Sequence, residues 1–194
     1  MLQGEPRARG RHVVVNDPRM KSVHYKPDLK VVSYDIETAM DELQLFCIAV
    51  HGRYKGESTR RVFMCGEGAQ QDYVASFGSQ AEVLSAFLDW VATYDPDVLI
   101  GWNVINFDTW YLQKIAEHTK GRLTLGRDNR EVHWRDLDDE GQRKAAQLPG
   151  RVILDGIDLL RAAFYRFESF SLENVSRELL AEGKLLHGAS RGEE

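Results

Sequence analysis

Long hydrophobic runs and cysteines are scarce in this sequence of 194 residues. No apolar stretch approaches the roughly 20 residues of a membrane-spanning helix. The polar, basic start of the chain does not look like a signal peptide. Cys47 and Cys65 cannot form a zinc site alone, and both lie in apolar, strand-like runs. We therefore expect reduced core thiols in a cytoplasmic protein that has no membrane partner.

Positive charge is also in short supply, because 25 Lys and Arg face 30 Asp and Glu, a net charge of −5. The composition therefore lacks the basic excess that is typical of nucleic-acid binders. The charge is uneven: residues 1–30 sum to +4, which leaves −9 for the rest. An acidic body with a basic arm fits a nuclease whose metal site collects carboxylates. It also fits a domain whose DNA-binding surface is supplied by an adjacent domain. It equally fits an arm that is a solvated linker.

Hydrophobic periodicity predicts an irregular basic lead-in over residues 1–29 and one domain over residues 30–194. We expect strands at 29–36, 42–51, 60–65, 97–101 and 150–155, the first three as an antiparallel meander. We expect helices between Ser79 and Asp95 and at 106–118, 156–166 and 171–182. The polar segment 126–149 is expected to be a surface insertion, with a hairpin as one form. This order implies an α/β fold, a mixed sheet with helices on both faces, compatible with a ribonuclease-H-like fold.

Asp35-Ile36-Glu37 ends the first expected strand. Alternate strand residues share a face, so Asp35 and Glu37 direct two carboxylates to one patch while Ile36 points into the core. Two adjacent carboxylates repel each other, and a divalent cation such as Mg²⁺ or Mn²⁺ resolves that repulsion. Taken alone, Asp-x-Glu is a weak motif that also fits an ordinary acidic strand end.

A second signal lies between Gly101 and Asp108, where a strand ends and a helix begins. Asp108 falls in the first helical turn, where the helix dipole favours a carboxylate with or without a chemical role. Asn103 fits a structural turn residue equally well, and spacing alone favours Phe107 as a core residue. If the two strand ends adjoin in the sheet, three carboxylates can meet and hold a pair of metal ions for attack on a phosphodiester.

With these motifs in order, the chain resembles the exonuclease domain of B-family DNA polymerases, and the bacterial members most of all. Single motifs are weak, but the ordered set at these spacings is specific. The resemblance covers residues 25–184 and rests on VVSYDIET (31–38), YDPDVLIGWNVINFD (94–108), LQK (112–114), LGRDN (125–129), GRVILDGI (150–157) and FSLENVSRELLAEGK (170–184).

The resemblance implies catalytic and metal-binding roles for Asp35, Glu37 and Asp108, with two Mg²⁺ or Mn²⁺ ions in the complete domain. It places the backbone of Thr38 near the terminal 3′-hydroxyl of the DNA. It places Asn103 and Phe107 along the single-strand path, where an amide bonds the nucleotide and a ring stacks.

Other matched positions carry supporting roles in the resemblance. Asp155 is expected to be mainly structural, and Ser171 with Asn174 to cap a helix. Residues 122–136 fall where the family carries a β-hairpin that helps to hold separated strands.

The function implied is a proofreading 3′→5′ exodeoxyribonuclease domain within a DNA-directed DNA polymerase. Its partners would be a single-stranded or frayed 3′ DNA end, the polymerase domain of the same chain and, as a further candidate, a sliding clamp. Its location would be the bacterial cytoplasm at the nucleoid.

One element of the family pattern is missing from the sequence. The family uses a fourth carboxylate in a Tyr-x-x-x-Asp motif beyond the segment that ends at Lys184, and no tyrosine here has Asp four positions later. The domain is therefore expected to be truncated before its last motif. This absence leaves a second hypothesis open, in which the domain is not an enzyme. It would then be a catalytically incomplete module that binds single-stranded DNA or a protein partner. An RNA-directed relative is less favoured, since the histidine variant of the motif, at His12 and His133, is misplaced.

Overall fold

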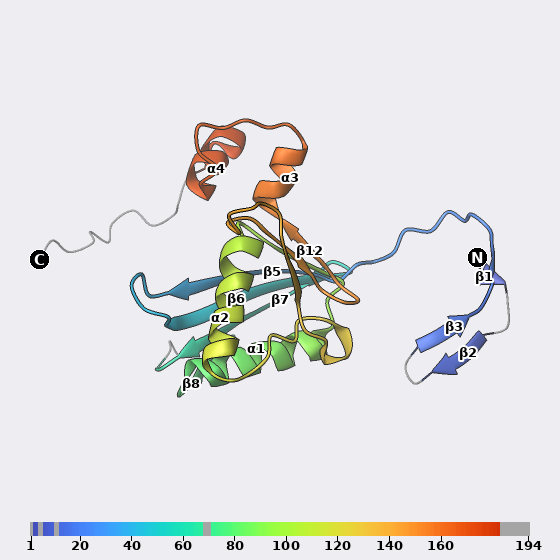
Figure 1. The fold of residues 1–194 in the computed structure, drawn as a ribbon, viewed down its shortest axis with the longest axis horizontal. Coiled ribbons are helices and arrows are strands. Elements are labelled where there is room, and N and C mark those ends of the chain that lie inside the picture. Colours follow the sequence, from blue (N-terminus) through green and yellow to red (C-terminus); the bar gives the residue numbers. More distant parts are fainter. Residues whose placement is uncertain (1, 4–5, 10–11, 68–70, 183–194) are drawn as a thin grey trace, which may run out of the picture.

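The computed structural model describes residues 2–3, 6–9, 12–67 and 71–182. Its centre is a mixed sheet in which β9, β5 and β12 run parallel and β6 runs antiparallel to both β5 and β7. Across the sheet the strands are β12 (Val152–Asp155), β9 (Val98–Gly101), β5 (Val31–Thr38), β6 (Leu45–Tyr54), β7 (Glu57–Cys65) and β8 (Val74–Phe77). In Figure 1, α2 (Trp110–His118) crosses in front of this sheet and α1 (Gln80–Tyr94) runs below it. The architecture is the mixed α/β, ribonuclease-H-like fold that the sequence predicts.

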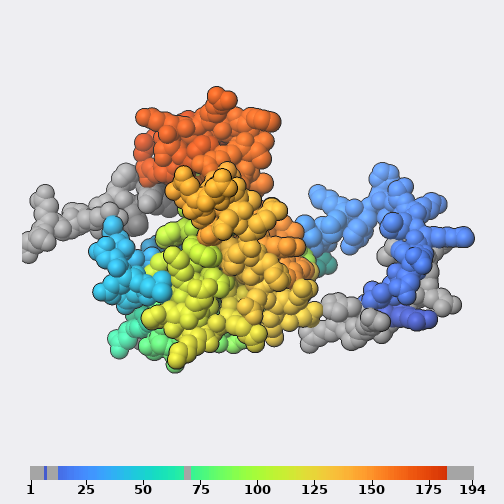
Figure 2. Space-filling view, viewed as in Figure 1, coloured from blue at the N-terminus to red at the C-terminus, as the bar shows by residue number. Residues whose placement is uncertain are grey.

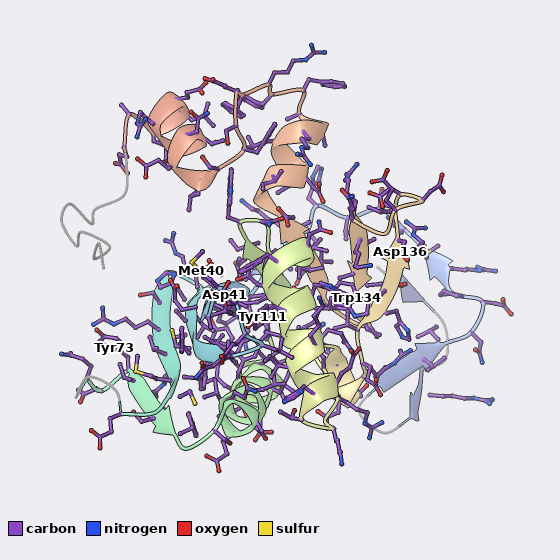
Figure 3. All side chains as sticks on the ribbon, turned by 60° about the vertical axis from the view of Figure 1, so that its left-hand side comes forward. Met40, Asp41, Tyr73, Tyr111, Trp134 and Asp136 are labelled. Atoms are coloured by element: carbon purple, nitrogen blue, oxygen red, sulfur yellow. The ribbon has the colours of Figure 1, made fainter. Side chains whose placement is uncertain are left out.

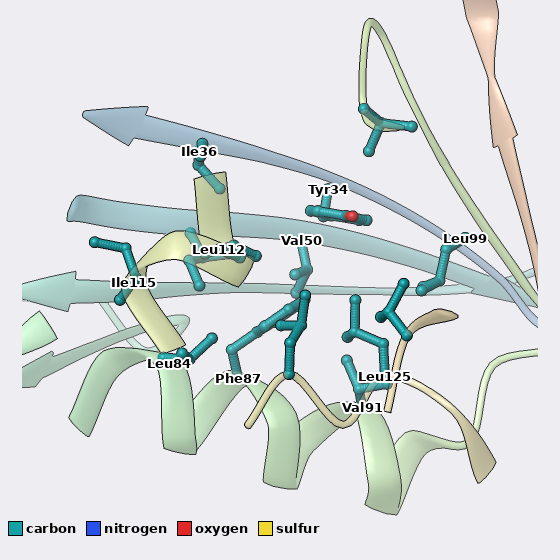
Figure 4. Close-up of a cluster of buried hydrophobic side chains, with 14 of the residues drawn as sticks. Tyr34, Ile36, Val50, Leu84, Phe87, Val91, Leu99, Leu112, Ile115 and Leu125 are labelled. Carbon is teal, nitrogen blue, oxygen red and sulfur yellow. The ribbon is translucent and has the colours of Figure 1, made fainter. Parts of the chain in front are cut away.

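Strand β5 shows why the sheet has two different faces. Its burial alternates, with Val32, Tyr34 and Ile36 buried and Asp35 and Glu37 exposed, as the two-residue period of a strand requires. The buried residues pack under α1 and α2, where Phe87 and Leu112 complete the core (Figure 4). The opposite face, where helices were also expected, is more open in the described part of the chain. Asp35 and Glu37 therefore lie on the accessible side of the sheet.

Helix α1 begins and ends where its flanking residues predict. Ser79 is its N-cap, and the Ser79 side chain accepts a hydrogen bond from the Glu82 backbone N–H. The Glu82 carboxylate in turn accepts from the Gly78 N–H, so one free amide of the first turn and the amide just before the cap are both satisfied. Asp95 ends the helix in the left-handed conformation, with φ of 52°.

Replacing Ser79 by alanine is expected to lower the free energy of unfolding by about 1 kcal/mol, because the Glu82 amide loses its acceptor. Ser85→Ala is a matched control, since Ser85 lies at an exposed interior position of the same helix. That change should be neutral or slightly stabilising, because alanine is the better helix former. Urea unfolding of both variants measures the difference. Equal stabilities would show that the cap contributes nothing.

A buried arginine fixes the end of the sheet that lies away from Asp35. The Arg151 guanidinium donates to the carbonyls of Pro96 (3.0 Å) and Leu125 (2.7 Å) and to the Asp95 carboxylate (3.0 Å). Arg127 bridges Asp95 and Asp97 beside it. These contacts join the ends of α1, β9 and β12, so the LGRDN segment has a structural role here.

The C-terminal helices α3 (Gly156–Ala162) and α4 (Leu172–Leu180) lie together beyond the end of β12 and form a raised part of the surface (Figures 1 and 2). Ser171 caps α4, and its side chain accepts a hydrogen bond from the backbone N–H of Asn174, as the sequence predicts. The segment 126–149 does contain a hairpin, formed by β10 (His133–Asp136) and β11 (Lys144–Gln147).

Two parts of the chain differ from the prediction. Strand β8 was not predicted, because its four residues VASF have no clear alternation. The lead-in was predicted to be irregular but contains short paired strands, too brief for periodicity to reveal; they are β1 (Leu2–Gln3) with β4 (Arg19–Met20), and β2 (Pro6–Arg9) with β3 (His12–Val15). In Figure 2 this segment stands apart from the body. Within the described residues, no helix has the length and apolar character to cross a membrane.

Candidate active site

The site is built where the ladder between β5 and β9 stops. Strand β9 pairs with β5 only from Val31 to Ser33, so the edge of β5 is free beyond that point. There the Ile36 N–H donates to Asp108 Oδ1 at 3.0 Å, in the direction in which a longer β9 would have continued. Asp108 belongs to η1 (Ile105–Thr109), a single π-helical turn that leads into α2. The free edge of the strand thus holds the carboxyl of Asp108.

Asp35 and Asp108 lie together. Burial, followed by the charge of Asp35 and a hydrogen bond with the Asp35 side chain, raises the pKa of Asp108 to about 8. Asp108 is 1% exposed, whereas Asp35 is exposed. Without a cation, Asp108 is therefore largely protonated at neutral pH and shares its proton with Asp35. A cation bound here would stabilise both carboxylates in the charged form.

Glu37 lies farther along the same face of β5. It is exposed, and its register partner on β6 is Cys47. Burial raises the pKa of the Cys47 thiol, and the nearby Glu37 carboxylate adds to the shift. In the described ranges, no three His, Cys, Asp or Glu side chains are grouped closely enough to hold a metal ion. The structure thus joins two of the three predicted carboxylates and leaves Glu37 beside the pair.

The donor chemistry at this strand end still fits a hard divalent cation. Mg²⁺ is commonly bound through one or two carboxylates, with water and substrate phosphate completing its coordination. The paired Asp35 and Asp108 carboxyl groups are oxygen ligands of that kind, and the raised pKa of Asp108 marks a place where negative charge lacks compensation.

The turn that precedes η1 is held by Asp155 at the end of β12. The Asp155 carboxylate accepts hydrogen bonds from the backbone N–H groups of Asn103 (3.2 Å), Ile105 (3.1 Å) and Ile157 (3.0 Å). Asn103 adopts the left-handed conformation, with φ of 56°. Gly101 is required at the start of the turn, because a Cβ there would lie 2.7 Å from Val104 Cβ. Asp155 thus has the structural contacts expected of it.

Of the three residues predicted to contact DNA, Asn103 lies in this turn and Phe107 directly follows it in η1. Thr38 ends β5 at a register shift. The backbone N–H of Asn103 donates to Asp155, as described above. Phe107 is 45% exposed, with its ring 6.1 Å from that of Tyr111, so the core position that spacing favoured for Phe107 is wrong. The π-turn inserts one extra residue, and this changes which side chains face outward.

Tyr111 was not singled out from the sequence, yet it links the two sides of the site. Its hydroxyl accepts from the Gln44 N–H (2.9 Å) and donates to the Glu42 carbonyl (3.1 Å), in the loop that follows Thr38. Figure 3 shows Met40 and Asp41 of this loop near Tyr111. A signal was available in principle, since a tyrosine hydroxyl at a helix–loop junction usually finds a backbone partner.

On its other side, the start of α2 carries the β10–β11 hairpin. Asn106 Oδ1 accepts from the Lys144 N–H at 2.7 Å, and the Trp134 and Trp110 rings meet edge to face, 4.9 Å between centroids. The Trp134 indole N–H also donates to Gln113. The hairpin is therefore fixed to the helical segment that presents Phe107 and Asp108, a contact that no local sequence pattern reveals.

Comparisons with known proteins agree with this geometry. The family model described as "DNA polymerase family B, exonuclease domain" matches residues 11–175. DNA polymerase II of Escherichia coli (strain K12) is 44% identical over 179 residues, which are 88% of this chain and 22% of that protein. A DNA polymerase of Desulfurococcus sp. (strain Tok) is 30% identical over 159 residues, 81% of this chain and 20% of that protein. This chain spans about a fifth of the length of these two relatives, and it belongs to the exonuclease-domain family of the B-family DNA polymerases.

Proposed function

We propose that the chain is a proofreading domain, a metal-dependent 3′→5′ exodeoxyribonuclease within a DNA-directed DNA polymerase. The observation that carries the proposal is the Asp35–Asp108 pair, drawn from two distant motifs to one open strand end. The family membership of the chain gives that pair its reaction class, nucleolytic cleavage. The direction of cleavage and the use of two metal ions are parts of the proposal.

In this proposal Asp35, Glu37 and Asp108 hold Mg²⁺ or Mn²⁺. Bound there, such cations would supply positive charge against the phosphodiester and make an attacking water more acidic. The protein's own contribution is to keep the carboxylates in place through the Ile36 amide and the Asp155-supported turn. Thr38 and Asn103 would contact the terminal nucleotide, and the exposed ring of Phe107 would stack on a base.

The proposed partners follow from the relatives. They are a single-stranded or frayed 3′ DNA end and the polymerase domain of the complete protein, with a sliding clamp as a further candidate. The proposed location is the bacterial cytoplasm, at the nucleoid, in keeping with the similarity to a bacterial polymerase.

A second candidate function rests on one specific observation. Among the residues described, Glu37 does not join Asp35 and Asp108 in a three-ligand group. A module that binds single-stranded DNA and does not cleave it would have such a site. Because a polymerase-derived binding module needs no bound cation to hold DNA, metal dependence separates the two functions.

Two single-stranded oligonucleotides, one labelled at the 5′ end and one at the 3′ end, test the proposal with the complete protein. With Mg²⁺, the 5′-labelled strand should shorten stepwise, while the 3′-labelled strand should release its label as a mononucleotide in the first step. Chelation of the metal should stop both. Retention of intact DNA by the protein, with and without Mg²⁺, would favour the binding module. Shortening from the 5′ end would overturn the direction.

A further inference from the structure

We infer that Tyr34 and Thr109 are positioning residues for Asp108, acting through a buried pair of hydroxyl groups. The inference rests on the proposed function for its consequence, metal binding, but the geometry stands independently of it. Tyr34 lies on β5 directly before Asp35, and Thr109 directly follows Asp108 in η1.

The two hydroxyls form a directed chain. Thr109 Oγ1 donates to the Val104 carbonyl at 2.6 Å, which uses its only proton. The Tyr34 hydroxyl, 2.5 Å from Thr109 Oγ1, must then be the donor of the second bond. Both residues are fully or almost fully buried, at 0% and 2% exposure. Neither hydroxyl can turn to water, so each holds the other in one orientation.

This chain stabilises the π-turn itself. The Thr109 backbone N–H bonds the Val104 carbonyl at 2.8 Å, five residues back, and the Thr109 side chain bonds the same oxygen. A regular α-helix would instead bond residues four apart. The hydroxyl of Thr109 therefore reinforces the wider turn, and Tyr34 fixes the turn to the sheet.

Two consecutive residues of η1 are thus attached to two alternate residues of β5. Asp108 bonds the Ile36 amide, and Thr109 bonds the Tyr34 hydroxyl. Asp35 lies between the two points of attachment. A two-point attachment prevents η1 from rotating or sliding along the strand, so it sets the separation of the Asp35 and Asp108 carboxyl groups.

The core alone does not require the Tyr34 hydroxyl. The ring packs against Phe87, with centroids 5.6 Å apart, and a phenylalanine would fill the same space (Figure 4). Burying a hydroxyl costs free energy unless it is bonded, and among the described residues the Tyr34 hydroxyl bonds Thr109 of η1. The Tyr34 hydroxyl thus holds η1 in place, and the Tyr34 ring packs in the core.

Thr109→Val tests the inference, because valine has the same shape and removes both hydroxyl bonds. Hydrogen–deuterium exchange of the complete protein, without metal, should show faster exchange at the Ile36 amide, by roughly tenfold. Mn²⁺ affinity, measured by titration calorimetry, should fall by a similar factor of roughly ten. Tyr34→Phe should have the same effects at a smaller size, and Thr109→Ser should restore both values.

Thr93→Val is the matched control. The Thr93 hydroxyl also bonds a backbone carbonyl within a helix, that of Asp89 at 2.8 Å, but it lies in α1 and is exposed. It should leave Ile36 exchange and Mn²⁺ affinity unchanged. Unchanged Ile36 exchange in Thr109→Val, even with lower overall stability, would overturn the inference. If the unsubstituted protein binds no Mn²⁺ but Ile36 exchange responds as expected, the positioning stands and the proposed nuclease function fails.

Discussion

The complete protein carrying Asp35→Ala and Glu37→Ala together is expected to release mononucleotides from a 3′ DNA end at least about a thousandfold more slowly than the unsubstituted protein. Asp35 is the partner of Asp108, and Glu37 is the remaining carboxylate on that face of β5. Their loss leaves the buried Asp108 carboxyl as the remaining member of the predicted carboxylate set to hold the cations. Single-turnover release of labelled nucleotide measures the effect. Neither side chain is buried, so the fold should be retained.

The adjacent acidic pair provides a control of equal charge. Asp41 and Glu42 are exposed in the loop after β5, and only the backbone of Glu42 bonds Tyr111. Asp41→Ala with Glu42→Ala removes the same two charges and should change the rate by less than about threefold. An equal loss in both double variants would point to overall charge and not to a metal site. Normal release from the Asp35/Glu37 variant would exclude these two residues from the chemistry.

Asp108→Asn is expected to stabilise the metal-free chain at high pH and not at low pH. The pKa of Asp108 is raised from 3.8 to about 8 in the fold, first by burial and then by Asp35. The stability that a raised carboxyl pKa contributes is complete below pH 4 and is lost as the pH rises through 8. Asparagine has no such loss, and it can still accept from the Ile36 amide and donate to Asp35. The variant should therefore gain about 4 kcal/mol over the unsubstituted chain between pH 5 and pH 9, since about three pH units separate pH 5 from the folded pKa.

Urea unfolding in the presence of a chelator at pH 5 and pH 9 measures that gain, taken as the difference between the two proteins at each pH. Other carboxylates titrate equally in both and cancel. Asp139→Asn makes the same substitution at an exposed position and is the matched control. A constant difference for Asp108→Asn across this pH range would mean that Asp108 is charged in the fold, and hence that Asp35 does not oppose its ionisation.

The sequence predicted the elements of the sheet well wherever burial alternates or a cap is present. Strand β5 and the Ser79-capped helix α1 are examples, since a two-residue period and a local hydrogen bond both leave a mark in the order of residues. Strand β8 left no such mark, because its four residues show no clear alternation.

For the site, the sequence predicted which residue types come near one another but not how they are held. The Asp-x-Glu spacing gave the shared face of Asp35 and Glu37, and the turn after β9 gave the approach of Asp108. The π-turn, the outward ring of Phe107 and the attachment of Asn106 to the hairpin depend on contacts between segments far apart in the chain. Such contacts have no local pattern, so only the folded structure shows them.

The short pairing between β5 and β9 limits where this domain can accept insertions in its sequence. Strand β9 leaves β5 after Ser33, and the amide left free at Ile36 is the one that Asp108 occupies. An insertion in β9 that continued the pairing would cover that amide with backbone and displace the carboxyl. This domain is therefore expected to tolerate insertions in the β10–β11 turn far better than at the end of β9, where a longer β9 would remove the strand edge that holds Asp108.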